Sequence, residues 1–298
     1  MNKITTQFSI NDLENLSGIK AHTIRIWEKR YKLLEPARTD SNIRFYDTTN
    51  LQKLLNVVTL YQAGNKISKI AELSPDHLKN MVQQLGIGKH GQNYFHNAFV
   101  LSMLNFDEQL FEETYNKLLA EVSFSSVFVD YFIPLLQNIG IDWQSDKITP
   151  ANEHFISCLI NQKLLINIER VKKTAKSSDE VYILFLPDNE LHELGLLYIH
   201  YELVLQGKHS IYLGASVPFD GLTKVAPLFS KIHYISYFTV QPSLERIQDY
   251  ISNFKIELLH NEDKLWLLGK NAQAIVLNNK DQNIEIFKKI EDLRNKIA

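Results

Sequence analysis

Hydrophobic and polar positions follow three different patterns along the chain. Up to about residue 75, the pattern predicts short helices separated by turn signals. Ser9 precedes the first of them, and Asp12 stands at the third helical position, which is close to a capping box. Two short helices joined by a turn that contains glycine are what a helix-turn-helix requires, because its second helix must lie in the major groove. The predicted helices cover residues 10–16, 21–31 and 49–62.

The middle of the chain is rich in helical periodicity and nearly free of glycine. Breaks at residues 73–76 and 86–91 predict a linker over residues 76–92. The domain expected at residues 93–176 contains four helices joined by short turns, which is typical of a four-helix bundle. These helices are predicted at residues 93–103, 107–122, 125–140 and 151–174.

From residue 177 to residue 298, short apolar runs alternate with helical segments. Strands are predicted at residues 181–186, 210–213, 234–239, 264–268 and 274–277. Helices are predicted at residues 194–206, 219–229, 243–254 and 283–296. Such alternation is typical of a doubly wound, flavodoxin-like parallel sheet, in which ligands bind beyond the carboxyl ends of the strands. The fold class predicted for the chain is therefore multidomain α and α/β.

Composition excludes several classes of protein. With 45% hydrophobic and 22% charged residues, the chain is neither collagenous nor disordered. No apolar run approaches the ~18 residues that span a bilayer, and the first residues lack the apolar stretch of a signal peptide. We therefore expect a cytoplasmic protein that does not enter a membrane. The single cysteine, Cys158, excludes an intrachain disulfide and a thiolate zinc cluster, so histidine is the expected metal ligand.

Charge is unevenly distributed along the chain. The net charge is −2, but residues 1–72 hold 11 Lys and Arg against 7 Asp and Glu, a net of +4. A basic head on an acidic body is expected of a protein that contacts nucleic acid at one end, although a solvated basic face has the same composition. Arg25 and Arg30 belong to the second predicted helix, and one of them can contact base edges while the other contacts phosphates.

Candidate chemistry lies directly after the first predicted strand of the third segment, in the pattern Glu190-x-His192-x-x-Gly195. An imidazole is a good ligand for a metal such as cobalt, and a carboxylate two residues away can accept the other ring proton, which fixes the tautomer. Gly195 leaves room for a close approach to the backbone. A lone surface histidine is the alternative, but its place at the expected ligand-binding edge favours a functional role.

The first segment resembles the DNA-binding domain of MerR-type transcription regulators. The run at residues 22–31, His-Thr-Ile-Arg-Ile-Trp-Glu-Lys-Arg-Tyr, is similar to the family's recognition helix, and residues 36–38 and 43–46 are similar to its wing. The resemblance implies a winged helix-turn-helix at residues 1–75 that binds double-stranded operator DNA. The side chains implied to face bases or phosphates are Arg25, Trp27, Arg30, Arg38, Arg44 and Tyr46. The alternative for Trp27 is a place in the core.

The rest of the chain resembles cobalamin-dependent photosensing regulators of the CarH/LitR type. Residues 177–298 are similar to the cobalamin-binding domain of corrinoid proteins, and Trp143, followed after nine residues by Glu153-His154, is similar to the helical cap over the cofactor. The resemblance implies that His192, supported by Glu190, is the lower axial cobalt ligand. It also implies that Gly195 lines the tunnel for the displaced nucleotide tail, and that the three cap residues lie over or near the upper ligand.

Three positions depart from that family. Other cobalamin domains carry a Ser-x-Leu element on the third strand, and the equivalent stretch here is Ser236-Tyr237-Phe238-Thr239. The Gly-Gly pair expected after the fourth strand is Gly269-Lys270, and both changes fall around the nucleotide tail. Gln144 follows the cap tryptophan where light-sensing relatives can carry His. The expected function is a non-enzymatic, cobalamin-controlled regulator, in particular a light-responsive repressor that uses adenosylcobalamin. It is expected to assemble as a homo-oligomer, a dimer or a tetramer, because several DNA heads on one operator gain avidity.

Three other functions are compatible with parts of the pattern. The first is a regulator with a degenerate sensor domain that answers to another ligand or to a protein, and the second is a light-independent cobalamin sensor. A corrinoid methyltransferase or mutase subunit would share the cobalamin domain. It would, however, be expected to bring thiolate zinc ligands or a catalytic barrel instead of a DNA-binding head.

Overall fold

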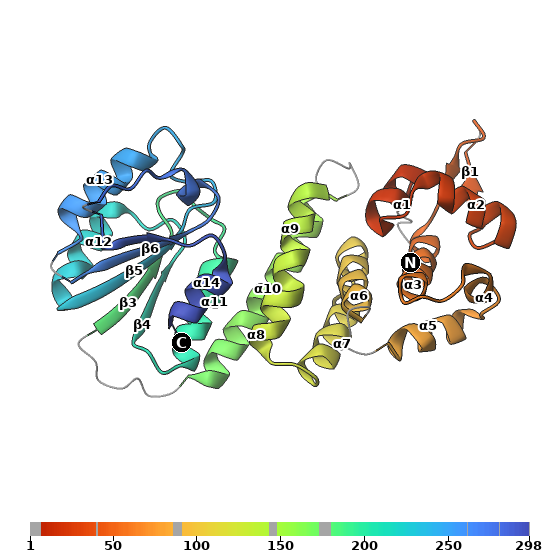
Figure 1. Ribbon diagram of the computed structural model, residues 1–298, viewed down its shortest axis with the longest axis horizontal. Helices are drawn as coiled ribbons and strands as arrows, with labels where there is room; N and C mark the ends of the chain where they lie inside the picture. Colours follow the sequence, from red (N-terminus) through yellow and green to blue (C-terminus); the bar gives the residue numbers. More distant parts are fainter. Residues whose placement is uncertain are drawn as a thin grey trace. The chain divides into compact units, whose positions relative to one another are not determined.

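The computed structural model describes residues 7–39, 41–85, 91–142, 148–172, 180–260, 262–279 and 281–297. The chain folds into two compact units, Met1–Leu159 and Ile160–Ala298. The first unit is mainly helical and the second contains a parallel sheet (Figure 1), so the predicted fold class of multidomain α and α/β is confirmed. The head and most of the helical bundle, predicted as separate domains, fall within the first unit, whereas the part of the last bundle helix from Ile160 on belongs to the second.

The head begins with two short helices, α1 (Ile10–Ser17) and α2 (Ala21–Tyr31), as predicted. The capping box is present, because the Ser9 side chain accepts from the Asp12 amide and the Asp12 carboxylate accepts from the Ser9 amide. Gly18 ends α1 in the left-handed region at φ 69°. The segment similar to a wing forms a small antiparallel pair, β1 (Ala37–Arg38) with β2 (Arg44–Phe45), and α3 (Thr48–Gln62) follows.

The break at residues 73–76 is the start of a helix and not a linker. After the short α4 (Ile67–Ala71), Ser74 caps α5 (Pro75–Gln83) by accepting from the His77 amide, and Pro75 occupies the first helical position. Serine and proline there favour a helix N-terminus as much as a loop, which is why the linker prediction was wrong over these residues. Residues 86–90, the other predicted break, lie outside the described residues.

The predicted helices of the bundle are present. They are α6 (Gly91–Asn105), α7 (Glu108–Leu119), α8 (Phe124–Val127), α9 (Ile133–Asp142) and α10 (Pro150–Val171). A π-helical turn, η1 (Phe128–Phe132), joins α8 to α9, so these three elements make up the single helix predicted at residues 125–140. Aromatic rings fill the core: Phe99 packs on Phe111 and on Phe132, with ring centroids 5.2 and 5.3 Å away. The buried Asn152 donates to the Met103 carbonyl (2.9 Å) and so fixes the start of α10 against α6.

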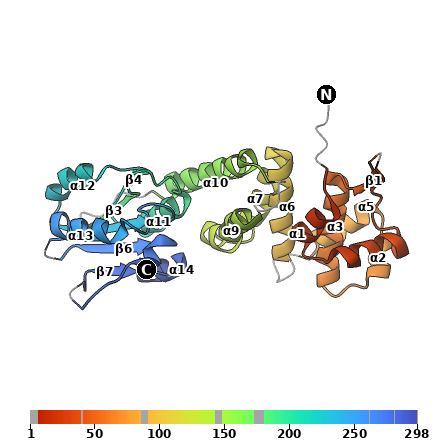
Figure 2. The same cartoon turned by 90° about the horizontal axis from the view of Figure 1, so that it is seen from above.

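The second unit is a five-stranded parallel sheet with the order β4-β3-β5-β6-β7. Figure 2 shows β4 and β7 at opposite edges. The doubly wound arrangement predicted for this segment is therefore present. The strands are β3 (Glu180–Phe185), β4 (Ser210–Gly214), β5 (Lys231–Tyr237), β6 (Lys264–Leu268) and β7 (Ile284–Ile286).

Helices cover both faces of this sheet (Figure 1). Alternate residues of β3 pack with α12 (Phe219–Val225) and α13 (Ile247–Glu257) in one apolar core. A short 3₁₀ turn, η2 (Ala226–Leu228), follows α12. On the other face lie α11 (Leu194–Leu205) and α14 (Ile290–Ile297), which pack on each other. The carboxyl ends of β3 and β5, which are neighbours in the sheet, thus meet at one edge.

The fifth strand was predicted in the wrong place. Residues 274–277 form no strand, because the side-chain amide of Gln248 takes the place of a neighbouring strand: it donates to the Val276 carbonyl (3.0 Å) and accepts from the Val276 amide (3.3 Å). A 3₁₀ turn, η3 (Asn271–Ala274), precedes this segment. The true edge strand, β7, occupies the beginning of the helix predicted at residues 283–296, so α14 starts only at Ile290.

Candidate functional sites

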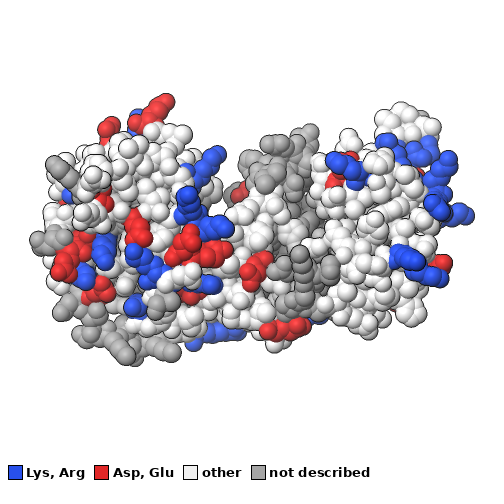
Figure 3. All heavy atoms as spheres, in the orientation of Figure 1, with Lys and Arg blue, Asp and Glu red and all other residues white. Residues whose placement is uncertain are grey.

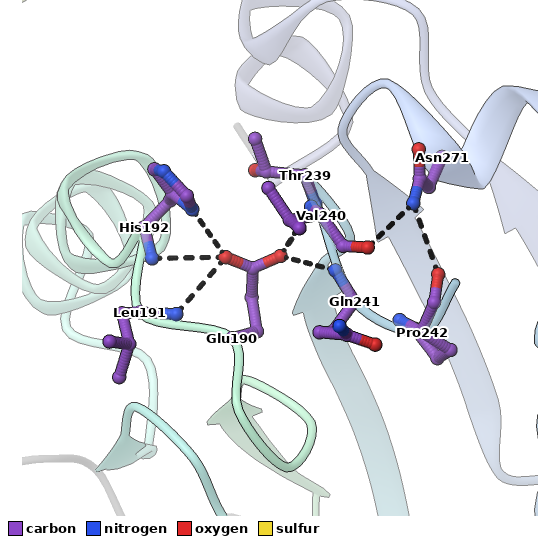
Figure 4. A network of polar contacts seen from close by, with 8 residues as sticks. All are labelled: Glu190, Leu191, His192, Thr239, Val240, Gln241, Pro242 and Asn271. Carbon is purple, nitrogen blue, oxygen red and sulfur yellow. Dashed lines mark hydrogen bonds and ion pairs between the residues drawn. The ribbon is translucent and has the colours of Figure 1, made fainter. Parts of the chain in front are cut away.

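A buried carboxylate ties together two loops at the carboxyl edge of the sheet. Glu190, in the loop after β3, is fully buried. Its Oε1 accepts from the amides of Leu191 (3.0 Å) and His192 (3.1 Å). Its Oε2 accepts from the three successive amides of residues 239–241, in the loop after β5, at 3.0, 2.6 and 2.8 Å (Figure 4). One side chain therefore fixes the relative position of both loops.

The predicted hydrogen bond between Glu190 and His192 is present. His192 Nδ1 lies 2.6 Å from Glu190 Oε1, and the imidazole is 56% exposed although the carboxylate is fully buried. Burial opposes ionisation of Glu190, yet the hydrogen bonds from the His192 ring and from backbone amides outweigh it and hold the pKa of the carboxyl at about 2. An ionised carboxylate can only accept, so Nδ1 carries the proton and Nε2 is the nitrogen suited to a metal.

The surroundings of His192 suit a large ligand with an apolar surface. Leu191 is 70% exposed and Val240 is 52% exposed, and both belong to the loops that Glu190 holds (Figure 4). Asn271 steadies the second loop, because its Nδ2 donates to the carbonyls of Val240 (2.9 Å) and Pro242 (3.0 Å). An imidazole whose Nδ1 is held by a carboxylate, on a loop with exposed apolar side chains nearby in the sequence and on the neighbouring loop, fits the donor set and the ring of a cobalamin.

Gly195 lies beside an aromatic ring of the protein itself. A Cβ added at Gly195 would lie 2.9 Å from Cε2 of Tyr237, closer than ordinary van der Waals contact allows. The group that lies against the Gly195 backbone in this structure is Tyr237, at the end of β5, and the role of Gly195 toward a cofactor stays a prediction. Gly269, which precedes Lys270, is required for a different reason: its φ is 98° and an added Cβ would lie 2.3 Å from the Phe238 carbonyl oxygen.

The predicted cap residues are only partly described. Trp143 and its neighbour Gln144 lie outside the described residues. Glu153 and His154 lie in the first turn of α10, with Glu153 partly exposed and His154 exposed. Both belong to the first compact unit, whereas His192 belongs to the second, and their role near a cofactor stays a prediction.

The exposed side of α2 is basic. Arg25, Lys29 and Arg30 are all exposed on this helix, and Arg38 and Arg44 are exposed on the wing. Figure 3 shows Lys and Arg gathered over α2 and the wing. A basic helix beside a basic hairpin can follow the phosphates of a duplex while the helix enters a groove.

Two residues predicted to contact DNA are buried instead. Trp27 is 5% exposed and packs edge-on against Tyr61, with ring centroids 5.2 Å apart, so its alternative place in the core is the correct one. Tyr46 is fully buried, and its hydroxyl donates to Glu28 Oε2 (2.9 Å). Glu28 also accepts from Arg44 Nε (3.0 Å), so this residue, which sequence reasoning missed, joins the wing to α2.

The comparisons with known proteins match the head and the helical bundle. Residues 8–76 match the family model described as MerR HTH family regulatory protein, and residues 96–166 match the one described as B12 binding domain. The chain combines a MerR-type helix-turn-helix with a B12-binding domain. The second match falls on α6 to α10, so Glu190 and His192 lie outside the matched range.

Two relatives are similar to this chain over most of its length. The HTH-type transcriptional repressor CarH of Myxococcus xanthus is 26% identical over 275 residues, 90% of each chain. The repressor CarA of the same organism is 25% identical over 215 residues, 70% of this chain and 68% of CarA. The monomethylamine corrinoid protein of Methanosarcina barkeri shares the fold, with a TM-score of 0.53 and 15% identity over 69% of this chain and 95% of that one. No helix in the described part of the chain is long and apolar enough to cross a membrane.

Proposed function

We propose that this chain is a transcription regulator whose binding to operator DNA is controlled by cobalamin. The observation that carries the proposal is the imidazole of His192, held by a buried Glu190 at the edge of a parallel sheet, in a chain that begins with a MerR-type DNA-binding head. The relatives that match it over most of its length are named as transcriptional repressors, which supports regulation rather than catalysis and repression rather than activation.

In this proposal the head contacts DNA through α2 and the wing. Arg25, Lys29 and Arg30 are exposed on α2 and supply contacts to bases and phosphates, while Arg38 and Arg44 hold phosphates from the wing. The Glu28 carboxylate acts behind this surface, since its hydrogen bond from Tyr46 and its ion pair with Arg44 set the angle of the wing.

The cofactor would be held on the sheet edge. His192 Nε2 is the nitrogen that would hold the cobalt, and Glu190 would keep the ring oriented through Nδ1. Leu191 and Val240 offer apolar surface beside it. Adenosylcobalamin, when bound, supplies a cobalt–carbon bond that light cleaves. Trp143, Glu153 and His154 are the residues proposed to cover the upper ligand.

Control of DNA binding would come from assembly. A ligand shifts assembly only if its affinity for the two states differs, so this proposal requires cobalamin to bind the assembled chains more tightly than the dispersed ones. A dimer or tetramer presents several heads to one operator, and the effective concentration of the second head strengthens binding. In light the assembly would then disperse and release the DNA.

The test begins with cofactor retention. The full chain is incubated in darkness with adenosylcobalamin, freed of unbound cofactor by gel filtration, and examined by absorbance. The wild-type protein should keep one corrin per chain, whereas His192→Ala should lose at least nine-tenths of it. His260→Ala is the matched control, because His260 is an exposed histidine of the same unit in the loop before β6. If the wild-type protein keeps no corrin, or keeps as much with alanine at residue 192, the cofactor proposal fails.

The regulatory step is tested on the same samples. A binding site is selected from random duplex DNA with the reconstituted protein in darkness. Affinity for that duplex and molar mass in solution are then measured before and after illumination. The proposal expects a lower molar mass and at least tenfold weaker DNA binding in light. Unchanged mass and unchanged affinity would reduce the function to light-independent sensing of cobalamin.

One observation favours a second candidate, a regulator whose sensor unit answers to another ligand or to a protein. The ring of Tyr237 stands against Gly195, at the place where the resemblance implies a passage for the cofactor's tail. This candidate expects no retained corrin in the first test, together with DNA binding that neither cobalamin nor light alters.

A further inference from the structure

Tyr237 lies against the backbone that closely follows the candidate metal ligand in the chain. It is the last residue of β5, and its half-buried ring lies against the first turn of α11. Three of its ring atoms would lie within 2.9 to 3.3 Å of a Cβ at Gly195, so the ring touches the bare backbone of that residue. Gly195 is only three positions after His192. The ring therefore fills space close to the base of the loop that presents the imidazole.

The chemistry of cobalamin makes that space important. The cofactor carries its own lower base on a nucleotide arm that hangs from the same face of the corrin ring to which His192 would bind. When His192 takes the place of that base, the base and its arm must be stored on the protein side of the ring, next to the imidazole. A corrinoid without the arm, such as cobinamide, makes no such demand.

We propose that Tyr237 occupies the place that the nucleotide arm needs and thereby selects for corrinoids with a small or absent arm over cobalamin. The proposal rests on the proposed cofactor role of His192 and names the class of corrinoid that the site prefers. The ring packs on the bare backbone of Gly195, so the space beside that glycine is filled by a side chain of the protein itself. Replacing the ring by a shorter side chain opens the space without touching the imidazole or its carboxylate.

The test compares two probes, adenosylcobalamin and adenosylcobinamide, which differ in the nucleotide arm. Dissociation constants of both are measured in darkness by absorbance titration and equilibrium dialysis with the full chain. Releasing cobalamin's own base from cobalt costs the same free energy with every variant. The effect of Tyr237 is therefore seen only as a change, from one variant to another, in the ratio of the two dissociation constants. Tyr237→Leu should tighten cobalamin binding at least tenfold, equivalent to about 1.4 kcal/mol, and leave cobinamide binding within twofold.

Tyr237→Phe is the matched control, because it keeps the ring and loses only the hydroxyl; its ratio should stay within twofold of wild type. Circular dichroism of each variant checks that the unit is folded. If cobinamide binds and Tyr237→Leu leaves the ratio unchanged, the role of Tyr237 is wrong while the cofactor proposal stands. If neither probe binds to the wild type or to Tyr237→Leu, both proposals fail.

Discussion

Replacing Glu190 by Gln should destabilise the second unit strongly, although the two side chains have nearly the same shape. The carboxylate accepts five backbone hydrogen bonds and one from the His192 ring, three on each oxygen. A glutamine amide has one oxygen, so in either orientation its NH₂ group faces three donors. Leaving a buried donor unpaired costs about 1–3 kcal/mol, and partial relaxation of the loops reduces the sum. We expect a loss of about 3–5 kcal/mol in the free energy of unfolding.

The assay is urea unfolding of the full chain without cofactor, followed by the fluorescence of Trp266. This tryptophan lies in β6 and is 3% exposed, so it reports on the unit that contains Glu190. Trp27 and Trp143 are replaced by Phe in every sample, so that Trp266 is the only tryptophan left. Because the chain has two compact units, a probe confined to one of them is needed for a two-state analysis.

Glu257→Gln is the matched control for this prediction. Glu257 is exposed at the end of α13 in the same unit, and its substitution should change stability by no more than about 0.5 kcal/mol. If the free energy of unfolding of Glu190→Gln is less than about 1 kcal/mol below that of the wild type, the reasoning is refuted, because the six hydrogen bonds would then contribute little to folding.

Three further predictions concern separate features. Arg38→Gln should lower the slope of log affinity against log salt by about 0.9 per lost phosphate contact, whereas Trp27→Phe should leave it unchanged because that ring is buried. DNA titrations at several salt concentrations measure both. Gly195→Ala should cost about 1–3 kcal/mol in urea unfolding by crowding Tyr237, and Tyr237→Leu in the same chain should restore most of it; purely additive losses would argue against the contact. Ser9→Ala should lower the stability of the head by about 1 kcal/mol, visible as a lower melting temperature.

Local features of the structure could be predicted from the sequence. The capping box at Ser9 and the hydrogen bond between Glu190 and His192 join residues two or three positions apart, so the chain itself brings them together. Serine and proline are found both in loops and at the start of helices, so they are ambiguous signals. Ser74-Pro75 begins a helix although these residues were predicted to open a linker. The strand predicted at residues 274–277 failed because a side chain, that of Gln248, pairs with its backbone.

Contacts between distant residues could not be predicted. That Tyr237 fills the space at Gly195 depends on how β5 lies against α11, which no spacing in the sequence reveals. Burial of Trp27 and Tyr46 depends on which side of each element faces the core, and motif similarity does not decide that. The hydrogen bonds from the amides of residues 239–241 could not be predicted, because a backbone donor is present whatever the side chain and residue types therefore do not indicate it.

That last property has a consequence for how this site can change over generations. The loop after β5 holds Glu190 only through backbone N–H groups, which every residue except proline possesses. Thr239, Val240 and Gln241 can therefore be exchanged for other residues without loosening His192. Substitutions there can alter the rim that meets a ligand while the metal-binding group stays in place, so ligand preference can drift even when the Glu-x-His motif is kept unchanged.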